Sequence, residues 1–167
     1  MYKGFASPPV SPGISLPGHA VWLAVDRMSA AAARVESVLA PSFIQKLMGG
    51  GGREAARAIV AAAFEESSSV RRTLIESSEA AIRQASGLES IANAGQDGSA
   101  AAMQASLQAR AMAGMCDRFK VIVDRWRDAA AAHQENQVGA AEQLLGVSKR
   151  FQALAKEIRT PTNGQRA

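Results

Sequence analysis

Apolar side chains recur at steps of four and three along the C-terminal half of the chain, between residues 103 and 158. This is the spacing of the a and d positions of helices that pack along a seam. The steps alternate except between His133 and Gln137, where one four follows another. The large members of this predicted seam are Met115, Phe119, Ile122, Trp126, Leu144, Val147, Phe151, Leu154 and Ile158.

The irregular step has two interpretations. A stutter is tolerated within a continuous helix, so one long helix of about 80 Å, ended by Pro161, is the simplest prediction. The polar segment from His133 to Gln137, followed by Gly139, is also where a turn would lie in a helical hairpin. We favour the continuous helix, because the pattern resumes immediately and a single glycine within a helix costs only ~1 kcal/mol.

Two more helices are predicted upstream of the seam. An apolar stripe at helical spacing predicts the first over about residues 19–39, ended by Pro41. The second is predicted over about residues 53–86, with Gly87 just beyond its end. A turn containing glycine and aspartate follows, and Ser99 has the side chain of a residue that caps the next helix.

A short apolar segment lies between these two helices. Ser42 and Gln45 match a capping box, which predicts a short helix with one apolar face. That face either packs under the other helices, which we favour, or offers an exposed contact. Its residues are Phe43, Ile44, Leu47 and Met48. The four glycines that follow predict a hinge, because a phosphate-binding loop would need a preceding strand and a Gly-Lys-Ser/Thr ending.

These patterns together predict an all-α protein. We expect an elongated up-down bundle of three long helices plus one short helix over residues 19–160. Residues 1–18 contain four prolines and are expected to form a disordered arm, and residues 161–167 a flexible tail. Aromatic residues make up only 5% of the chain, and period-two alternation is not evident, so a sheet is not expected.

The charge pattern and the hydropathy narrow the function classes. The formal net charge of +4 is spread among interspersed acidic residues, so we expect no specific nucleic-acid partner. No apolar run approaches the ~20 residues that span a bilayer, and no signal peptide is evident at the N-terminus. The expectation is a cytoplasmic protein of bacterial type, with secretion that needs no cleaved signal left open.

Candidate chemistry is sparse. His19 and His133 lie in no metal-ligand spacing, and the only cysteine, Cys116, cannot form an internal disulfide. Cys116 and His133 would lie about 25 Å apart on one continuous helix, too far for a nucleophile and its base. We therefore expect no enzyme activity and assign no catalytic, cofactor-binding or metal-binding residue.

The order of segments between residues 72 and 154 resembles that of a phasin, the small Ala-rich helical protein that coats bacterial polyhydroxyalkanoate granules. The segment TLIESSEAAIRQASGL is followed by a short polar connection and then by SAAAMQASLQARAMAGMCDRFKVIVDRW. Phasins similarly have an Ala/Ser-rich amphipathic helix, a turn, and a Gln/Ala-rich helix with an aromatic residue midway. The resemblance implies a coat on hydrophobic storage granules, with no catalytic residues.

Two other interpretations rest on shape alone. A long helix after a Pro-rich start also fits a secretion-system structural component or secreted substrate, such as a needle, tip or minor-pilin-like subunit. A cytoplasmic coiled-coil adaptor is the third. In both, the seam would join the protein to copies of itself or to a helical partner protein.

Overall fold

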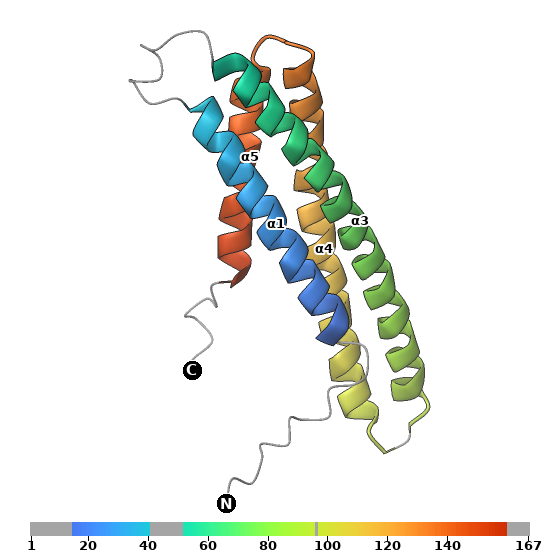
Figure 1. The fold of residues 1–167 in the computed structure, drawn as a ribbon. Helices are drawn as coiled ribbons and strands as arrows, with labels where there is room; N and C mark the ends of the chain where they lie inside the picture. Colours follow the sequence, from blue (N-terminus) through green and yellow to red (C-terminus); the bar gives the residue numbers. More distant parts are fainter. Residues whose placement is uncertain (1–14, 41–51, 96, 160–167) are drawn as a thin grey trace, which may run out of the picture. The chain divides into compact units, whose positions relative to one another are not determined.

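The computed structural model of the protein describes residues 15–40, 52–95 and 97–159. These residues form four α-helices and no strand, so the predicted all-α class is confirmed (Figure 1). The helices are α1 (Ser15–Leu39), α3 (Gly52–Asn93), α4 (Ser99–Gln134) and α5 (Ala140–Arg159). The predicted short helix, with its apolar contact residues Phe43, Ile44, Leu47 and Met48, lies outside the described residues, as do most of the predicted arm and the tail.

The first helix begins earlier than predicted. Residues 15–18, which we assigned to the arm, belong to α1. Pro17 lies in the first turn of α1, where a backbone N–H has no acceptor within the helix in any case. A proline there costs little, so its presence did not exclude a helix.

The end of α3 was also predicted wrongly, because the helix continues past Gly87 to Asn93. A glycine inside a helix lowers helix stability by ~1 kcal/mol relative to alanine. Contacts made by the helical turn after Gly87 offset this cost. Glu89 accepts two hydrogen bonds from Arg110 of α4, at 2.6 and 2.9 Å. The predicted turn before α4 is present, but the carbonyl of Gly98 accepts the first helical hydrogen bond, from Ala102. Gly98 therefore stands at the cap position that we assigned to Ser99.

The predicted continuous seam helix is broken, and the prediction of three long helices was wrong for this reason. The N–H of Gln137 donates to the carbonyl of Ala132, and that of Asn136 to the carbonyl of His133. These two bonds form a Schellman motif, with Asn136 in the left-handed conformation at φ 56°. Gly139, at φ 77°, accepts the first hydrogen bond of α5. The stutter marked a turn because asparagine and glycine both tolerate positive φ.

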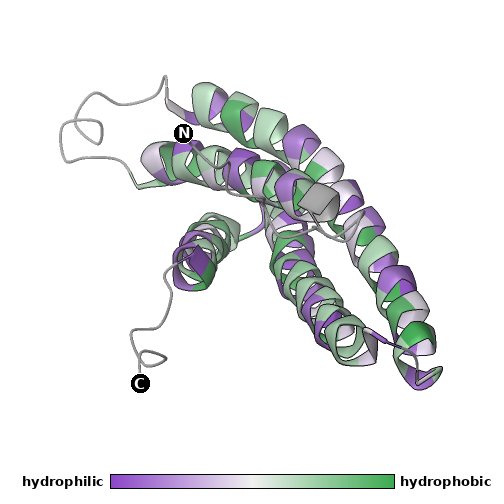
Figure 2. Ribbon diagram, turned by 90° about the horizontal axis from the view of Figure 1, so that it is seen from below, coloured by the Kyte–Doolittle hydropathy of each residue, from purple (hydrophilic) through white to green (hydrophobic). Residues whose placement is uncertain are grey.

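The structure divides into two compact units. Unit 1 comprises Met1–Leu23 and Thr73–Arg118, and unit 2 comprises Ala24–Arg72 and Phe119–Ala167. Helices α1, α3 and α4 each contribute one segment to both units. Every helix carries hydrophobic and hydrophilic residues, as expected for amphipathic helices that bury one face (Figure 2).

Unit 1 is built on small side chains. Its α3 and α4 segments run antiparallel, because Ser78 bonds to Asp117 while the later Glu89 pairs with the earlier Arg110. Small buried side chains allow two helices to approach closely, but they bury little apolar area. The buried residues of unit 1 are Val21, Leu74, Ser77, Ser78, Ala81, Ala85, Ala102, Ser106, Ala109, Ala113 and Cys116.

Unit 2 holds the large side chains. Its most voluminous fully buried residues are Trp126, Phe119, Phe151, Met28 and Leu144. Side-chain contacts join each of its four helical segments to two others. These contacts are Arg27–Glu66 for α1 and α3, Arg71–Asp124 for α3 and α4, Trp126–Ser148 for α4 and α5, and Arg159–Asp26 for α5 and α1.

Candidate interaction surfaces

The structure separates the predicted seam into two rows. The inner row is buried and comprises Phe119, Trp126, Leu144, Phe151 and Leu154. The outer row is half-buried and comprises Met115, Ile122, Val147 and Ile158. The helical pattern identified residues that all lose solvent exposure, but it did not distinguish the two rows.

The inner row is engaged within unit 2. The rings of Phe119 and Phe151 lie with their centroids 5.5 Å apart and tilted by 48°. The indole Nε1 of Trp126 donates a hydrogen bond of 2.9 Å to the hydroxyl of Ser148, which is itself fully buried. Phe119 of α4 contacts Phe151 of α5, whereas the later Trp126 bonds to the earlier Ser148. The two segments therefore run antiparallel. A partner molecule could reach the inner row only after α4 and α5 separate.

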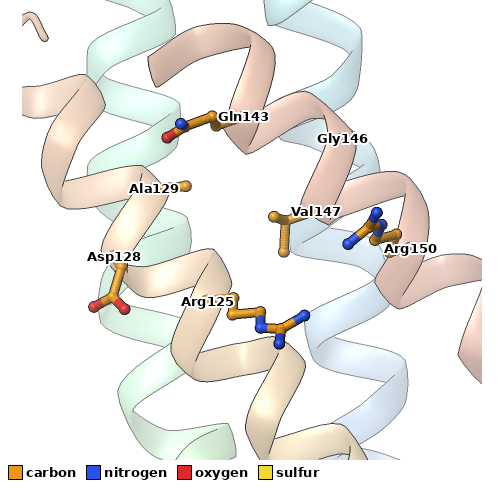
Figure 3. A pocket seen from close by; sticks show the side chains of 7 residues that line it. All are labelled: Arg125, Asp128, Ala129, Gln143, Gly146, Val147 and Arg150. Atoms are coloured by element: carbon orange, nitrogen blue, oxygen red, sulfur yellow. The ribbon is translucent and has the colours of Figure 1, made fainter. Parts of the chain in front are cut away.

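A groove lies between α4 and α5, and the outer row contributes Val147 to it. The groove has a volume of about 470 Å³ (Figure 3). Its lining residues, which define what we call the α4–α5 groove, are Arg125, Asp128, Ala129, Gln143, Gly146, Val147 and Arg150. Ala129, Gly146 and Val147 are the small or apolar residues of the lining, and the others are charged or polar.

Two arginines flank this groove from different helices. In Figure 3 the guanidinium of Arg125 extends from α4 towards α5, below Val147, and that of Arg150 lies beside Val147. Both arginines are exposed, and neither has a hydrogen-bond or ion-pair partner within the part of the chain that the structure describes. Their positive charge is therefore available to an anionic group from outside.

Three charged residues of α4 in unit 2 are paired, namely Lys120, Asp124 and Arg127. Burial tends to raise the pKa of Asp124, but hydrogen bonds from Lys120 and Arg71 and the charges of both outweigh it and lower that pKa. The bonds measure 2.9 Å from Lys120 and 2.6 Å from Arg71. The carboxylate of Asp124 is thus held ionised by its neighbours, in contrast to the groove arginines.

Unit 1 exposes large apolar side chains on one side of its α3–α4 pair. Arg110 and Asp117 mark the side of α4 that faces α3. Met103 and Leu107 lie seven and three residues before Arg110. On a helix this spacing places them next to Arg110 and away from the buried alanines. Ile82 of α3 follows Ser78 by one turn and lies on the same side. We call Ile82, Met103 and Leu107, which are 44%, 41% and 60% exposed, the outer apolar patch.

The cysteine and the two histidines have different surroundings. Cys116 is fully buried in unit 1, and burial, together with the charge of Asp117, raises the pKa of its thiol to about 11. His133 lies in the last turn of α4, and burial and the charge of Arg57 lower its pKa. His19 is exposed in α1. Across residues 15–40, 52–95 and 97–159, no group of three or more His, Cys, Asp and Glu side chains is placed to hold a metal ion.

Comparison with family models, curated proteins and solved structures found no match for this chain. Within the described ranges, no helix combines the length and the apolar character that crossing a membrane requires.

The groove arginines were not singled out from the sequence, although a signal was present. Arg125 and Arg150 each precede an inner-row residue directly, Trp126 and Phe151. On a helix, a residue next to a buried one lies about 100° around the axis, at the edge of the buried face. Arg125 and Arg150 flank the same groove because α5 folds back onto α4. The prediction of one continuous helix excluded this arrangement.

Proposed function

We propose that this protein is a non-catalytic helical interaction protein that coats hydrophobic particles, as the resemblance to phasins implies. The observation that carries the proposal is the outer apolar patch of unit 1, which exposes Ile82, Met103 and Leu107 on one side of the α3–α4 pair. Exposed apolar surface on one side of a helix pair is typical of interaction sites.

The mechanism follows from helix geometry. An amphipathic helix lays its apolar side chains on a hydrophobic surface and keeps its charged side chains in water. The antiparallel pair of unit 1 presents two such helices side by side, and its Glu79 and Arg83 are exposed. Three side chains that each lose roughly half of their exposed area would contribute ~1 kcal/mol apiece, or about 100-fold in affinity together.

The inner row of the seam is less suited to this task. Phe119, Trp126 and Phe151 are fully buried within unit 2, so their adsorption would first require the core of that unit to open. We infer an up-down order of α1, α3, α4 and α5. The antiparallel α3–α4 pair of unit 1 and the antiparallel α4–α5 pair of unit 2 support this order. In this arrangement the protein adsorbs as folded helices through unit 1.

The test is adsorption of the purified protein to octyl-coated beads. The triple variant Ile82→Gln, Met103→Gln and Leu107→Gln is expected to bind about 100-fold more weakly than the parent protein while keeping its helical circular dichroism. Equal adsorption of the parent and the triple variant would contradict the proposal.

The chain offers a matched control in the same helix. Ile91 is 55% exposed, which exceeds the value for Ile82, but it lies nine residues further along α3 and therefore on the opposite side of the helix. Ile91→Gln is expected to leave adsorption unchanged. If Ile91→Gln weakened adsorption as much as Ile82→Gln does, apolar exposure in general, rather than the outer apolar patch, would be responsible.

A further inference from the structure

We propose that the α4–α5 groove of unit 2 is a docking site for an acidic amphipathic helix of a partner protein. This site is separate from the outer apolar patch and would be used in addition to particle coating. The inference rests on the shape of the groove, on its unpaired arginines and on the composition of the rest of the chain.

The groove lies between two helices, where a third helix can pack. It runs between two antiparallel helices, and side-chain ridges of a third helix pack into such a groove. Ala129 and Gly146 have small side chains or none, so they leave space in the groove. A Cβ built on Gly146 would meet no neighbouring atom within 4 Å. Val147, which is half-buried, offers an apolar contact. An apolar side chain of the incoming helix can therefore approach the backbone of α5 closely.

The charge at the groove selects the partner. Arg71, Arg127 and Arg159 all have acceptors within unit 2, whereas Arg125 and Arg150 have none among the described residues. A guanidinium group binds a carboxylate through two parallel hydrogen bonds, which makes arginine well suited to acidic side chains. Two arginines near the apolar side chain of Val147 thus match a helix with carboxylates close to an apolar residue.

The residues of this sequence that lie outside the described ranges lack the acidic side chains of such a helix. Residues 1–14, 41–51 and 160–167, together with residue 96, contain no aspartate or glutamate. They carry instead Lys3, Lys46 and Arg166, which the two groove arginines would repel. These residues therefore do not supply the carboxylates that would pair with Arg125 and Arg150, and we assign them to a partner protein.

Asp128 also lines the groove and gives it polarity. It lies one turn after Arg125 on α4 and lines the groove together with Ala129 and Gln143. A carboxylate of the partner would be repelled there, whereas a lysine would be attracted. The partner helix is therefore expected to place its acidic residues by Arg125 and Arg150, with a neutral or basic residue one turn away.

The proposal can be tested with designed helical peptides and the full chain. The first probe is a fluorescein-labelled peptide of five helical turns with a leucine stripe flanked by glutamates, and the second has glutamine in place of each glutamate. Fluorescence anisotropy is expected to show binding of the glutamate peptide that weakens at high salt. Arg125→Gln and Arg150→Gln should each weaken this binding about tenfold, and Gly146→Leu should abolish it by filling the groove.

A matched control is available on another helix. Arg72 is exposed on α3 and lies outside the groove, so Arg72→Gln should leave the binding unchanged. Equal binding of the glutamine peptide, or unchanged binding by Gly146→Leu, would overturn the proposal.

Two further measurements separate other occupants. Binding to phosphatidylglycerol vesicles that requires both arginines, without peptide binding, would show a lipid site and overturn the proposal. So would a dimer of the protein alone that Arg125→Gln dissociates, since the occupant would then be a second copy. Each result is independent of bead adsorption, so the two proposals can fail separately.

Discussion

The guanidinium carbon of Arg127 lies 4.2 Å from the centroid of the Phe64 ring, so α4 and α3 are joined in unit 2 by a cation–π contact. The same guanidinium donates hydrogen bonds of 2.8 and 2.6 Å to the hydroxyls of Ser67 and Ser68, and one of 3.2 Å to the carbonyl of Phe64. The serines in the middle of α3 therefore have a structural role, because they accept hydrogen bonds from an arginine that crosses from the neighbouring helix.

Replacement of Arg127 should destabilise the protein. Arg127→Ala removes the cation–π contact and leaves three part-buried oxygen acceptors without this donor, which should lower the free energy of unfolding by about 2 kcal/mol. Urea denaturation followed by circular dichroism measures this change. Arg125→Ala, two residues earlier, is the control and should change stability by less than ~0.5 kcal/mol, since Arg125 is exposed. Equal losses in both variants would argue against a special role for Arg127.

Trp126 and Ser148 should be energetically coupled. Trp126→Ala is expected to cost about 3–5 kcal/mol, because the indole is fully buried. Trp126→Phe retains much of the packing but leaves the buried hydroxyl of Ser148 without its donor, so a loss of about 1–3 kcal/mol is expected. In a double-mutant cycle with Ser148→Ala, the two changes should be non-additive by at least ~0.5 kcal/mol. Strictly additive losses would show that the hydrogen bond contributes little.

The same substitution should have opposite effects at two glycines near the start of α5. Gly139→Ala forces a side chain into φ 77° and should lower stability by about 1 kcal/mol or more. Gly146 is helical and has open space where a Cβ would lie, so Gly146→Ala should raise stability by up to ~1 kcal/mol. Melting temperatures of the two variants test the pair. A loss of stability in Gly146→Ala would mean that this position does not tolerate a methyl group.

Acidification should weaken the fold through His133. Its pKa is lowered in the folded protein by burial and by the charge of Arg57, so the folded state binds the proton less readily than the unfolded state. The associated stability is present above the ordinary pKa of 6.5 and is lost as the pH falls below it. Urea denaturation at about pH 8 and about pH 5 should show a smaller decline for His133→Gln than for the parent.

The control for this measurement is His19→Gln. His19 is exposed in α1, and its replacement should leave the decline between the two pH values as it is in the parent. An unchanged decline in His133→Gln would assign the acid sensitivity to other groups.

The sequence predicted those features that depend on short stretches of the chain. The spacing of Phe119, Trp126, Leu144 and Phe151 identified buried helical positions, because a helix turns its side chains to one side every three or four residues. The turn around Gly95 and Gly98 was predicted for a related reason, since turn chemistry acts over only a few residues.

The break between α4 and α5 was not predicted from the apolar spacing. The apolar period continues across Asn136 because α5 folds back onto α4 and must bury a similar face. Periodicity alone therefore cannot distinguish a straight helix from a hairpin. Asn136 and Gly139 carried the missing signal, as residues that readily adopt positive φ.

Tertiary structure decided which side of each helix contacts a neighbouring helix and which side remains exposed to solvent. Arg125 and Arg127 are two residues apart on α4, yet Arg127 crosses to Phe64 and Ser67 while Arg125 flanks the α4–α5 groove. Likewise, the inner row is buried and the outer row half-buried, although both consist of large apolar side chains. The sequence by itself determined that this protein is helical and which positions avoid water, because these depend on local periodicity. Which helix covers which face depends on contacts between residues far apart in the chain, so only the folded structure decided it.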